Sequence, residues 1–332
     1  MGSAALSGVV VRILVVGAGA IGGYFGGRLV AAGRDVVFLV RPKRAAQLAQ
    51  TGLVIRSRFG DVNWPAPPTV TADALRDPFD LILLSCKAYD LAAAADSFAP
   101  AVGTQTAILP LLNGMAHLDF LASRFGRSHV LGGLCVISAT LGPEGDIRHL
   151  NDIHRMAFGE KDGTVSPRSK AIAAALSGAG FESRLSNAIL QEMWDKWVFI
   201  AAAAGITCLM RAAFGDIVAA GAVDLTTALF DECCEIAAAQ GFPPGEATRK
   251  FTRSMLTAPQ STITASMLRD IERAGPIEAD HIVGDLLRRS TAKPPNDRSL
   301  LRLAYAHLKA YEARRKREQT ASETAGSVRV PA

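Results

Sequence analysis

Cysteines and aromatic residues are scarce in this chain of 332 residues. Its five cysteines are scattered without a C-x-x-C pair, and Phe, Trp and Tyr together make up 6% of the residues. The sequence also opens without the charged start of a secretory signal, so we expect a reducing, cytoplasmic location. Few aromatics beside abundant alanine suit closely packed helices more than a β-sandwich.

Long hydrophobic runs and a strong net charge are missing as well. The longest apolar run, Trp197 to Met210, is shorter than a bilayer span, so it predicts a buried helix and no membrane segment. The formal net charge is +5, and without aromatic interleaving or a recognisable module we expect no nucleic-acid binding. A basic run ends at Arg317, and the polar residues 318–332 after it are expected to form a flexible tail.

Patterns typical of metal sites and hydrolases are also lacking. His117, His149 and His154 have no metal-ligand spacing, so we expect no metal. Neither a G-x-S-x-G motif nor a Ser-His-Asp order is present. Hydrophobic residues, in contrast, make up 49% of the chain, which is enough to build sizeable cores.

The two halves of the chain differ in their patterns. In the first half, short apolar β-like runs alternate with helical stretches, and a hairpin-like segment begins at Leu53. This predicts an α/β Rossmann-type domain with a doubly wound, mostly parallel sheet over residues 1–185. From Ser186 onward helix signals follow one another between Gly- and Pro-containing breaks, which predicts an all-α substrate domain over 186–317.

A glycine-rich segment follows the first predicted strand and opens the first helix. In G-x-G-x-x-G, the first glycine permits a tight turn, the second lets a pyrophosphate approach, and the third lets the helix pack on the strand. The N–H groups at the helix N-terminus favour phosphates. The alternative is a glycine-rich turn without a ligand. The residues predicted to bind a dinucleotide are Gly17, Ala18, Gly19, Ala20, Ile21 and Gly22.

The end of the second predicted strand indicates which dinucleotide is bound. An acidic residue there holds a ribose 2′-hydroxyl, whereas a 2′-phosphate needs cations. This chain has Arg41, Lys43 and Arg44 and no acid at this place. Arg41 can stack on an adenine and donate to a phosphate, so NADPH/NADP+ is favoured over NADH. The alternative is a basic helix start that faces water.

Five short motifs stand in order along the chain, and with the two-part layout they resemble the ketopantoate reductase (2-dehydropantoate 2-reductase) family. The resemblance extends from about Arg12 to Leu308 and implies NADPH-dependent reduction of a 2-oxo acid to a 2-hydroxy acid, ketopantoate to pantoate in the pantothenate pathway. The motifs are the glycine-rich turn, "CKAYD" from Cys86, "LNGM" from Leu112, "WDKW" from Trp194 and "SMLRDIERAGPIEADHIVG" from Ser266.

The resemblance also implies a set of site residues. Lys196 is expected to be the general acid, and Glu278 to hydrogen-bond near the reacting centre and the cofactor. Asn113 is expected to touch both the nicotinamide and the substrate, and Ser266 to hold the substrate carboxylate. Lys87 and the backbone of Ala139 are expected to line the cofactor site.

Elementary chemistry supports these roles but leaves alternatives open. Reducing a ketone needs a hydride on carbon and a proton on oxygen, and burial among tryptophans would lower the pKa of Lys196 and make it a better acid. Lys196 could instead pair with Glu192 one turn earlier on a solvated face. Glu278 is expected in the first turn of a helix, where any carboxylate is favoured. Asn113 could lie in a plain turn, and Asp270, one turn after Ser266, is interpreted as structural support.

Three positions depart from the family pattern. Family members present asparagines four and eight residues after the lysine and another at a following turn, whereas this chain has Ile200, Ala204 and Phe214 there. Since a hydroxyl buried without a partner costs about 1–3 kcal/mol, these changes predict a more apolar substrate, such as a 2-oxo acid with a hydrophobic tail.

Two other functions remain open. One is a related NADP-dependent dehydrogenase or imine reductase with a different substrate, although such relatives often use a histidine in place of the lysine. The other is a non-catalytic NADPH-binding regulator, which the loss of Lys196 or Asn113 would have favoured. The partner expected is a small-molecule 2-oxo acid, and the oligomeric state stays open, with a homodimer as one candidate.

Overall fold

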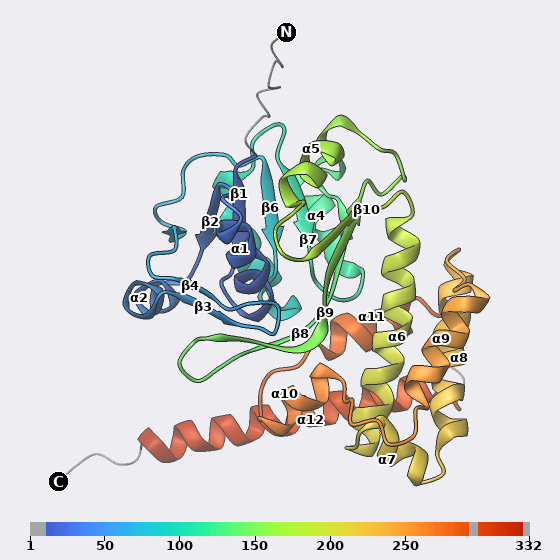
Figure 1. Cartoon of the computed structure of the whole chain (residues 1–332). Helices are drawn as coiled ribbons and strands as arrows, with labels where there is room; N and C mark the ends of the chain where they lie inside the picture. The colour runs from blue at the N-terminus through green and yellow to red at the C-terminus, as the bar shows by residue number, and fades with distance from the viewer. Residues whose placement is uncertain (1–10, 292–297, 328–332) are drawn as a thin grey trace, which may run out of the picture. The chain divides into compact units, whose positions relative to one another are not determined.

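The computed structural model describes residues 11–291 and 298–327, with side chains up to residue 321. The chain forms two compact units (Figure 1). The first unit contains most of the chain up to Leu190, and the second unit contains the helical remainder together with Asn113–Ala116. The expected division between an α/β part and an all-α part is therefore present, but the Asn113 turn is grouped with the helices.

The first sheet of the first unit is entirely parallel and has the order β5-β2-β1-β6-β7. Its central strands are buried, as the apolar runs in the sequence predict for a parallel sheet connected by helices. The strands are β1 (Ile13–Val16), β2 (Val36–Leu39), β5 (Thr69–Val70), β6 (Leu81–Leu84) and β7 (Ala107–Pro110). The helices and turns that follow them are α1 (Ala20–Ala31), α2 (Pro42–Thr51), η1 (Ala88–Asp90), α3 (Leu91–Phe98) and α4 (Ala116–Phe125).

A second sheet has the order β10-β9-β3-β4, with β8 paired to β9. The antiparallel pair of β3 (Leu53–Arg56) and β4 (Val62–Trp64) confirms the predicted hairpin. The long strands β8 (Gly132–Leu141) and β9 (Ile147–Gly159) form an antiparallel ribbon, and β10 (Glu182–Leu185) follows α5 (Pro167–Leu176).

Helix α1 packs against strands of both sheets because its glycines allow close approach (Figure 1). A Cβ atom at Gly26 would lie 2.5 Å from the Phe38 ring of β2, and one at Gly27 would lie 2.7 Å from Ile55 of β3. A Cβ at Gly23 would meet Ile147 of β9 at 2.4 Å. The glycines that follow the G-x-G-x-x-G motif therefore serve helix packing.

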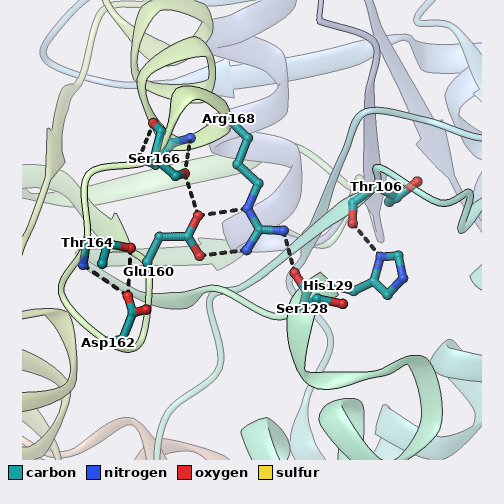
Figure 2. A network of polar contacts seen from close by, with 9 residues as sticks. Thr106, Ser128, His129, Glu160, Asp162, Thr164, Ser166 and Arg168 are labelled. Atoms are coloured by element: carbon teal, nitrogen blue, oxygen red, sulfur yellow. Dashed lines mark hydrogen bonds and ion pairs between the residues drawn. The ribbon is translucent and has the colours of Figure 1, made fainter.

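A polar network holds the start of α5 at the end of β9 (Figure 2). Glu160 accepts hydrogen bonds from the Ser166 hydroxyl at 2.6 Å and from Arg168 Nε and Nη2 at 2.7 and 2.6 Å. Ser166 caps α5 by accepting from the backbone N–H of Ser169. These bonds to its charged form hold the pKa of Glu160 below its usual value.

Helices joined by loops make up the described residues of the second unit, and no strand occurs among them. Helix α6 is long and apolar enough to cross a membrane, but 67% of its most apolar window is buried, as expected for a core helix. A Cβ at Gly205 would lie 2.8 Å from Leu229, so α6 packs closely on α8. The elements are α6 (Ile189–Met210), α7 (Phe214–Ala219), α8 (Val223–Ala239), α9 (Glu246–Leu256), α10 (Ser266–Glu272), the π-helical turn η4 (Asp280–Gly284), α11 (Asp285–Arg288) and α12 (Leu300–Ser327).

The last helix corrects the expected tail. Helix α12 continues through residue 317 to Ser327, so residues 318–327 are helical. Glu, Ala and Gln in this stretch are good helix formers, and Arg314 lies one turn before Glu318, 3.6 Å away, where opposite charges support a helix. The remaining tail residues, 328–332, lie outside the described residues.

Candidate active site

The turn between β1 and α1 gives each glycine of the motif a different role. Gly17 adopts a φ of 94°, a left-handed conformation that favours glycine. Gly19 is exposed at the N-terminus of α1, and a Cβ there would meet no atom within 4 Å. A Cβ at Gly22 would lie 2.2 Å from both the Gly17 carbonyl oxygen and Ser85 Oγ. The turn is therefore tight and packed beneath but open on its outer side, which fits a pyrophosphate.

Ser85, directly after β6, is a site residue that the sequence analysis missed. Its hydroxyl donates a 2.9 Å hydrogen bond to the carbonyl oxygen of Val16 at the end of β1. This bond ties the glycine-rich turn to the neighbouring strand. A serine after an apolar strand gives little signal in one sequence, since it is also an ordinary loop residue.

Arg41 and the "CKAYD" segment meet where β2 and β6 end. Arg41 directly precedes α2, its side chain is 74% exposed, and Nη2 donates to Asp90 Oδ1 at 2.8 Å. Asp90 closes the turn η1, which begins after the half-buried Lys87. The predicted 2′-phosphate residue and the predicted cofactor lysine thus belong to one surface region of the first unit.

Arg44 stabilises the backbone of the glycine-rich turn through hydrogen bonds. Its Nε donates to the carbonyl oxygen of Ala18 at 3.1 Å, and Nη2 donates to that of Gly145 at 3.1 Å. Burial lowers the pKa of this guanidinium. Of the two further cations predicted to add charge, Lys43 is exposed, whereas Arg44 holds the backbone of the turn.

Ala139 lies on β8 directly after a register shift between β8 and β9, and it pairs with His149. Such irregularities change the direction of a strand locally and are common beside functional sites. This half-buried residue therefore lies at an irregular point of the β8–β9 ribbon, in the first unit.

In the second unit, the Asn113 turn packs against the turn η4. Gly114 has a φ of 78°, and a Cβ there would lie 2.8 Å from the carbonyl oxygen of His281 and 3.3 Å from its Nε2. The His281 imidazole also hydrogen-bonds the backbone of Asn113. His281 was not predicted as a site residue, since nothing in the spacing of residues 113 and 281 indicates a contact.

Lys196 is half-buried on α6, next to the buried Trp197. The indole Nε1 of Trp197 donates to the carbonyl oxygen of Ile282 at 2.8 Å, and this bond joins α6 to η4. The rings of Trp194 and Trp197 lie 4.8 Å apart, and the Arg289 guanidinium lies 5.8 and 5.4 Å from them. Lys196 therefore lies on a segment of α6 that is fixed by packed aromatic rings and by a bond to η4.

Glu278 is 7% exposed and stands directly before the helical segment that contains η4. Its carbonyl oxygen accepts from the backbone N–H of Ile282 at 3.0 Å. The residue was expected in the first helical turn and lies one step earlier. π-Helical turns such as the one that follows it are often found at functional sites.

Ser266 and Asp270 share one face of α10, as predicted. Ser266 is the exposed first residue of the helix, and the carbonyl oxygen of Asp270 accepts from the Gly275 N–H at 2.8 Å. The loop before α10 is held by α7, because the Phe214 N–H donates to the carbonyl oxygen of Ile263 at 3.1 Å.

The three positions that lack asparagine differ in exposure. Ile200 is half-buried on α6, four residues after Lys196, whereas Ala204 and Phe214 are 2% and 1% exposed. Ile200 therefore has the largest accessible surface of the three. Among the described residues, no group of three or more His, Cys, Asp or Glu could hold a metal ion.

Two features together define a class of oxidoreductases: a parallel α/β unit with a glycine-rich turn, and a helical unit that carries a lysine, an asparagine and a glutamate. The family models for "Ketopantoate reductase PanE/ApbA" and its C-terminal part match residues 13–163 and 188–312. The chain belongs to the ketopantoate reductase family, and this places it among oxidoreductases that act on carbonyl and secondary hydroxyl groups.

Individual relatives agree with this assignment. An uncharacterized oxidoreductase, YkpB, of Bacillus subtilis (strain 168) is 39% identical over 307 residues, which cover 91% of this chain and 99% of the relative. A 2-dehydropantoate 2-reductase of Archaeoglobus fulgidus is 27% identical, with 84% and 90% of the two chains covered. The crystal structure of 2-dehydropantoate 2-reductase from Methylococcus capsulatus has a TM-score of 0.80 at 29% identity, with 92% and 97% covered. D-mandelate dehydrogenase shares the fold, with a TM-score of 0.81 at 20% identity over 92% and 99%.

Proposed function

We propose that this protein reduces a 2-oxo acid to a 2-hydroxy acid with NADPH, and that its substrate is more apolar than ketopantoate. The observation that carries the proposal is the open backbone at Gly19 after β1, together with the exposed Arg41 after the neighbouring strand β2. The free N–H groups of α1 and the positive end of its dipole suit a pyrophosphate, and a guanidinium suits a 2′-phosphate. Lys87 and the backbone of Ala139 complete the proposed cofactor site.

The second unit supplies the groups for the carbonyl. NADPH supplies a hydride when bound. Lys196 would donate the proton that the carbonyl oxygen needs, so that C=O would become CH–OH with the hydride on carbon and the proton on oxygen. Ser266 holds the substrate carboxylate, Asn113 orients the carbonyl, and Glu278 hydrogen-bonds beside the reacting centre. Metal is not needed in this scheme, since a positioned cation stabilises the developing alkoxide.

The proposed substrate class follows from the apolar residues Ile200, Ala204 and Phe214, which stand where the family has asparagines. A site that hydrogen-bonds a substrate hydroxyl rejects compounds that lack it, whereas an apolar site discriminates weakly. With Ile200 where the family has an asparagine, the hydroxyl of ketopantoate loses a partner, and a branched or aromatic tail gains a contact surface. Ketopantoate reduction in pantothenate biosynthesis remains the alternative within the same chemistry.

The proposal is tested by NADPH oxidation with ketopantoate and a panel of branched and aromatic 2-oxo acids. We expect faster turnover of the apolar acids, and loss of turnover in Lys196→Ala. Lys250→Ala is the matched control, because Lys250 is an exposed lysine on α9. Efficient turnover of ketopantoate alone would contradict the substrate shift, and full activity of Lys196→Ala would contradict its role as general acid.

Substitution Ile200→Asn tests the substrate shift from the opposite side. Restoring an amide should raise kcat/KM for ketopantoate and lower it for the apolar acids, since each hydrogen bond to a substrate hydroxyl contributes about 0.5–1.5 kcal/mol. Quenching of tryptophan fluorescence by NADPH without turnover of any carbonyl compound would instead support a non-catalytic regulator. Turnover of imines, or of secondary alcohols with NADP+ alone, would support a related dehydrogenase or imine reductase.

We also propose a cytoplasmic location for this activity. All five cysteines are thiols, and the three on α6 and α8 are buried. Burial raises the pKa of Cys208 to about 12 and that of Cys234 to about 11, so both are unreactive thiols at neutral pH. Such cysteines suit a reducing compartment.

A further inference from the structure

His281 lies in the π-helical turn η4, three residues after Glu278. Its backbone and ring both lie against the Asn113 turn. A Cβ at Gly114 would be 2.8 Å from the carbonyl oxygen of His281, 3.1 Å from Cδ2 and 3.3 Å from Nε2. Only a glycine allows this approach, and its φ of 78° also favours glycine. The contact therefore depends on the backbone conformation at Gly114 and on the close approach of the backbone at His281.

The imidazole adds a directional bond to this contact. It hydrogen-bonds the backbone of Asn113, and because this bond favours the protonated ring nitrogen, the imidazole donates to the Asn113 carbonyl oxygen. The acceptor belongs to the residue whose carboxamide is proposed to orient the substrate carbonyl. A bond at this atom fixes the peptide plane from which the Asn113 side chain projects.

The turn that carries His281 is itself held by three further contacts. Trp197 Nε1 donates to the Ile282 carbonyl oxygen at 2.8 Å from the helix that carries Lys196. On the neighbouring residue Asp280, Oδ1 accepts from the Tyr305 hydroxyl at 2.5 Å and Oδ2 accepts from Lys309 Nζ at 2.9 Å. η4 is thus anchored to both α6 and α12, and it offers a rigid support for His281.

The neutral form of the His281 imidazole is sufficient for this hydrogen bond, because it keeps one N–H to donate. Burial lowers the pKa of His281, and Arg288 acts in the same direction, while the carboxylates of Glu278 and Asp285 oppose them. The ring is therefore neutral at pH 7, with one N–H to donate and no net charge beside the proposed reacting centre.

We infer that His281 is a positioning residue, which sets the Asn113 carboxamide relative to Glu278 and Lys196 through its contact with the Asn113–Gly114 backbone. This inference rests on the proposed function, because it assigns the turn to substrate orientation. His281 touches neither the hydride nor the transferred proton. It acts through Asn113, and its loss should mainly affect kcat, because misplacement of a substrate by about 1 Å can cost roughly 100-fold in rate.

The test compares three substitutions at one position in the full chain. His281→Phe keeps a planar ring without a donor, His281→Gln keeps an N–H donor, and His281→Ala removes both. With the best 2-oxo acid of the panel, we expect the kcat of the Phe and Ala variants to fall about 10- to 100-fold. The Gln variant should recover most of this loss. The dissociation constant for NADPH should stay within about threefold in all three, since the proposed contacts to the pyrophosphate and the 2′-phosphate lie in the first unit.

The matched control is His129→Ala in the first unit. His129 Nδ1 also donates to a backbone carbonyl, that of Thr106, at 2.7 Å (Figure 2). Its loss should lower the melting temperature without lowering kcat. Thermal melting of every variant distinguishes a loss of stability from a loss of kcat. Kinetics are measured at a temperature at which all variants are folded.

The outcomes distinguish the inference from the function on which it rests. Loss of kcat in His281→Phe with recovery in His281→Gln supports the inference. Wild-type kcat in His281→Phe, or equal losses in the Phe and Gln variants, overturns it and leaves the proposed reductase intact. Absence of turnover by the wild-type protein with every acid of the panel overturns the proposed function and the inference together.

Discussion

The indole nitrogen of Trp197 donates a 2.8 Å hydrogen bond to the carbonyl oxygen of Ile282, and both residues are buried. One partner follows Lys196 directly in sequence, and the other lies four residues after Glu278. The bond therefore joins the two segments that carry the proposed general acid and the proposed site carboxylate. It explains how residues far apart in the chain are held in one part of the second unit.

Removing this bond should cost stability. In Trp197→Phe an aromatic ring remains, but the buried carbonyl of Ile282 loses its donor, so we expect the free energy of unfolding to fall by about 1–3 kcal/mol. Activity should fall as well, because η4 loses its anchor on α6. Urea unfolding measures the first effect. Trp64→Phe is the control, since Trp64 is 36% exposed on β4, and a change there should stay within about 0.5 kcal/mol.

The glycine-rich turn gives a prediction with a built-in control. In Gly19→Ala the new methyl group meets no atom within 4 Å, so the fold should stay intact while the methyl blocks a pyrophosphate. We expect normal thermal melting and a dissociation constant for NADPH raised at least about tenfold, the equivalent of about 1.4 kcal/mol.

Gly22→Ala should behave in the opposite way. Its methyl group would lie 2.2 Å from the Gly17 carbonyl oxygen and from Ser85 Oγ, so the helix must shift and the protein should lose about 1–3 kcal/mol of stability. Calorimetry and NADPH fluorescence titration measure both variants. A Gly19→Ala protein that binds NADPH as tightly as the wild type would remove this turn from the proposed cofactor site.

Much of the fold could be predicted from local patterns, because a buried parallel strand and a glycine-rich turn between strand and helix have their signatures within a few residues. The packing glycines of α1 and the face shared by Ser266 and Asp270 belong to this kind of information. The contact between Gly114 and His281 does not, since it depends on how distant segments pack. The helical extension to Ser327 was missed because a polar, Ser- and Thr-containing stretch was interpreted as a tail, although Ala and Glu in it favour a helix.

Arg41 and Asp90 offer a test of cofactor preference. Arg41→Ala should raise the dissociation constant for NADPH about 10- to 100-fold, since a hydrogen bond to a charged group contributes about 1.5–3 kcal/mol. Binding of NADH should change little. Asp90→Asn removes the carboxylate that accepts from Arg41 at 2.8 Å, so it should tighten NADPH binding.

Fluorescence titration with both dinucleotides measures these effects. Arg56→Ala is the matched control, because Arg56 is another exposed arginine of the first unit, with its own 2.8 Å ion pair to Asp61. Both arginine variants should retain their stability to within about 1 kcal/mol, since exposed ion pairs contribute little. Equal weakening of NADPH and NADH by Arg41→Ala would contradict a 2′-phosphate site.

A histidine pair beside α1 predicts that acid destabilises the first unit. His154 Nδ1 lies 2.7 Å from the Tyr24 hydroxyl, and the Phe59 ring stacks on the His154 imidazole with centroids 4.0 Å apart. Burial lowers the pKa of His154, and His149 and Arg28 act in the same direction, against Glu182. The imidazole of His154 therefore binds a proton less readily in the folded protein than in the unfolded chain.

The sign of the pH effect follows from this difference. As pH falls below about 6.5, the unfolded chain binds a proton at this histidine before the folded protein does, so the free energy of unfolding decreases until the folded pKa is passed. Urea unfolding between about pH 8 and pH 5 should show this loss, and His154→Gln should flatten it, because glutamine does not titrate. The difference between the two curves isolates His154 from the carboxylates, which titrate in both proteins. Parallel curves for the two proteins would show that the imidazole takes up its proton as readily in the folded protein as in the unfolded chain.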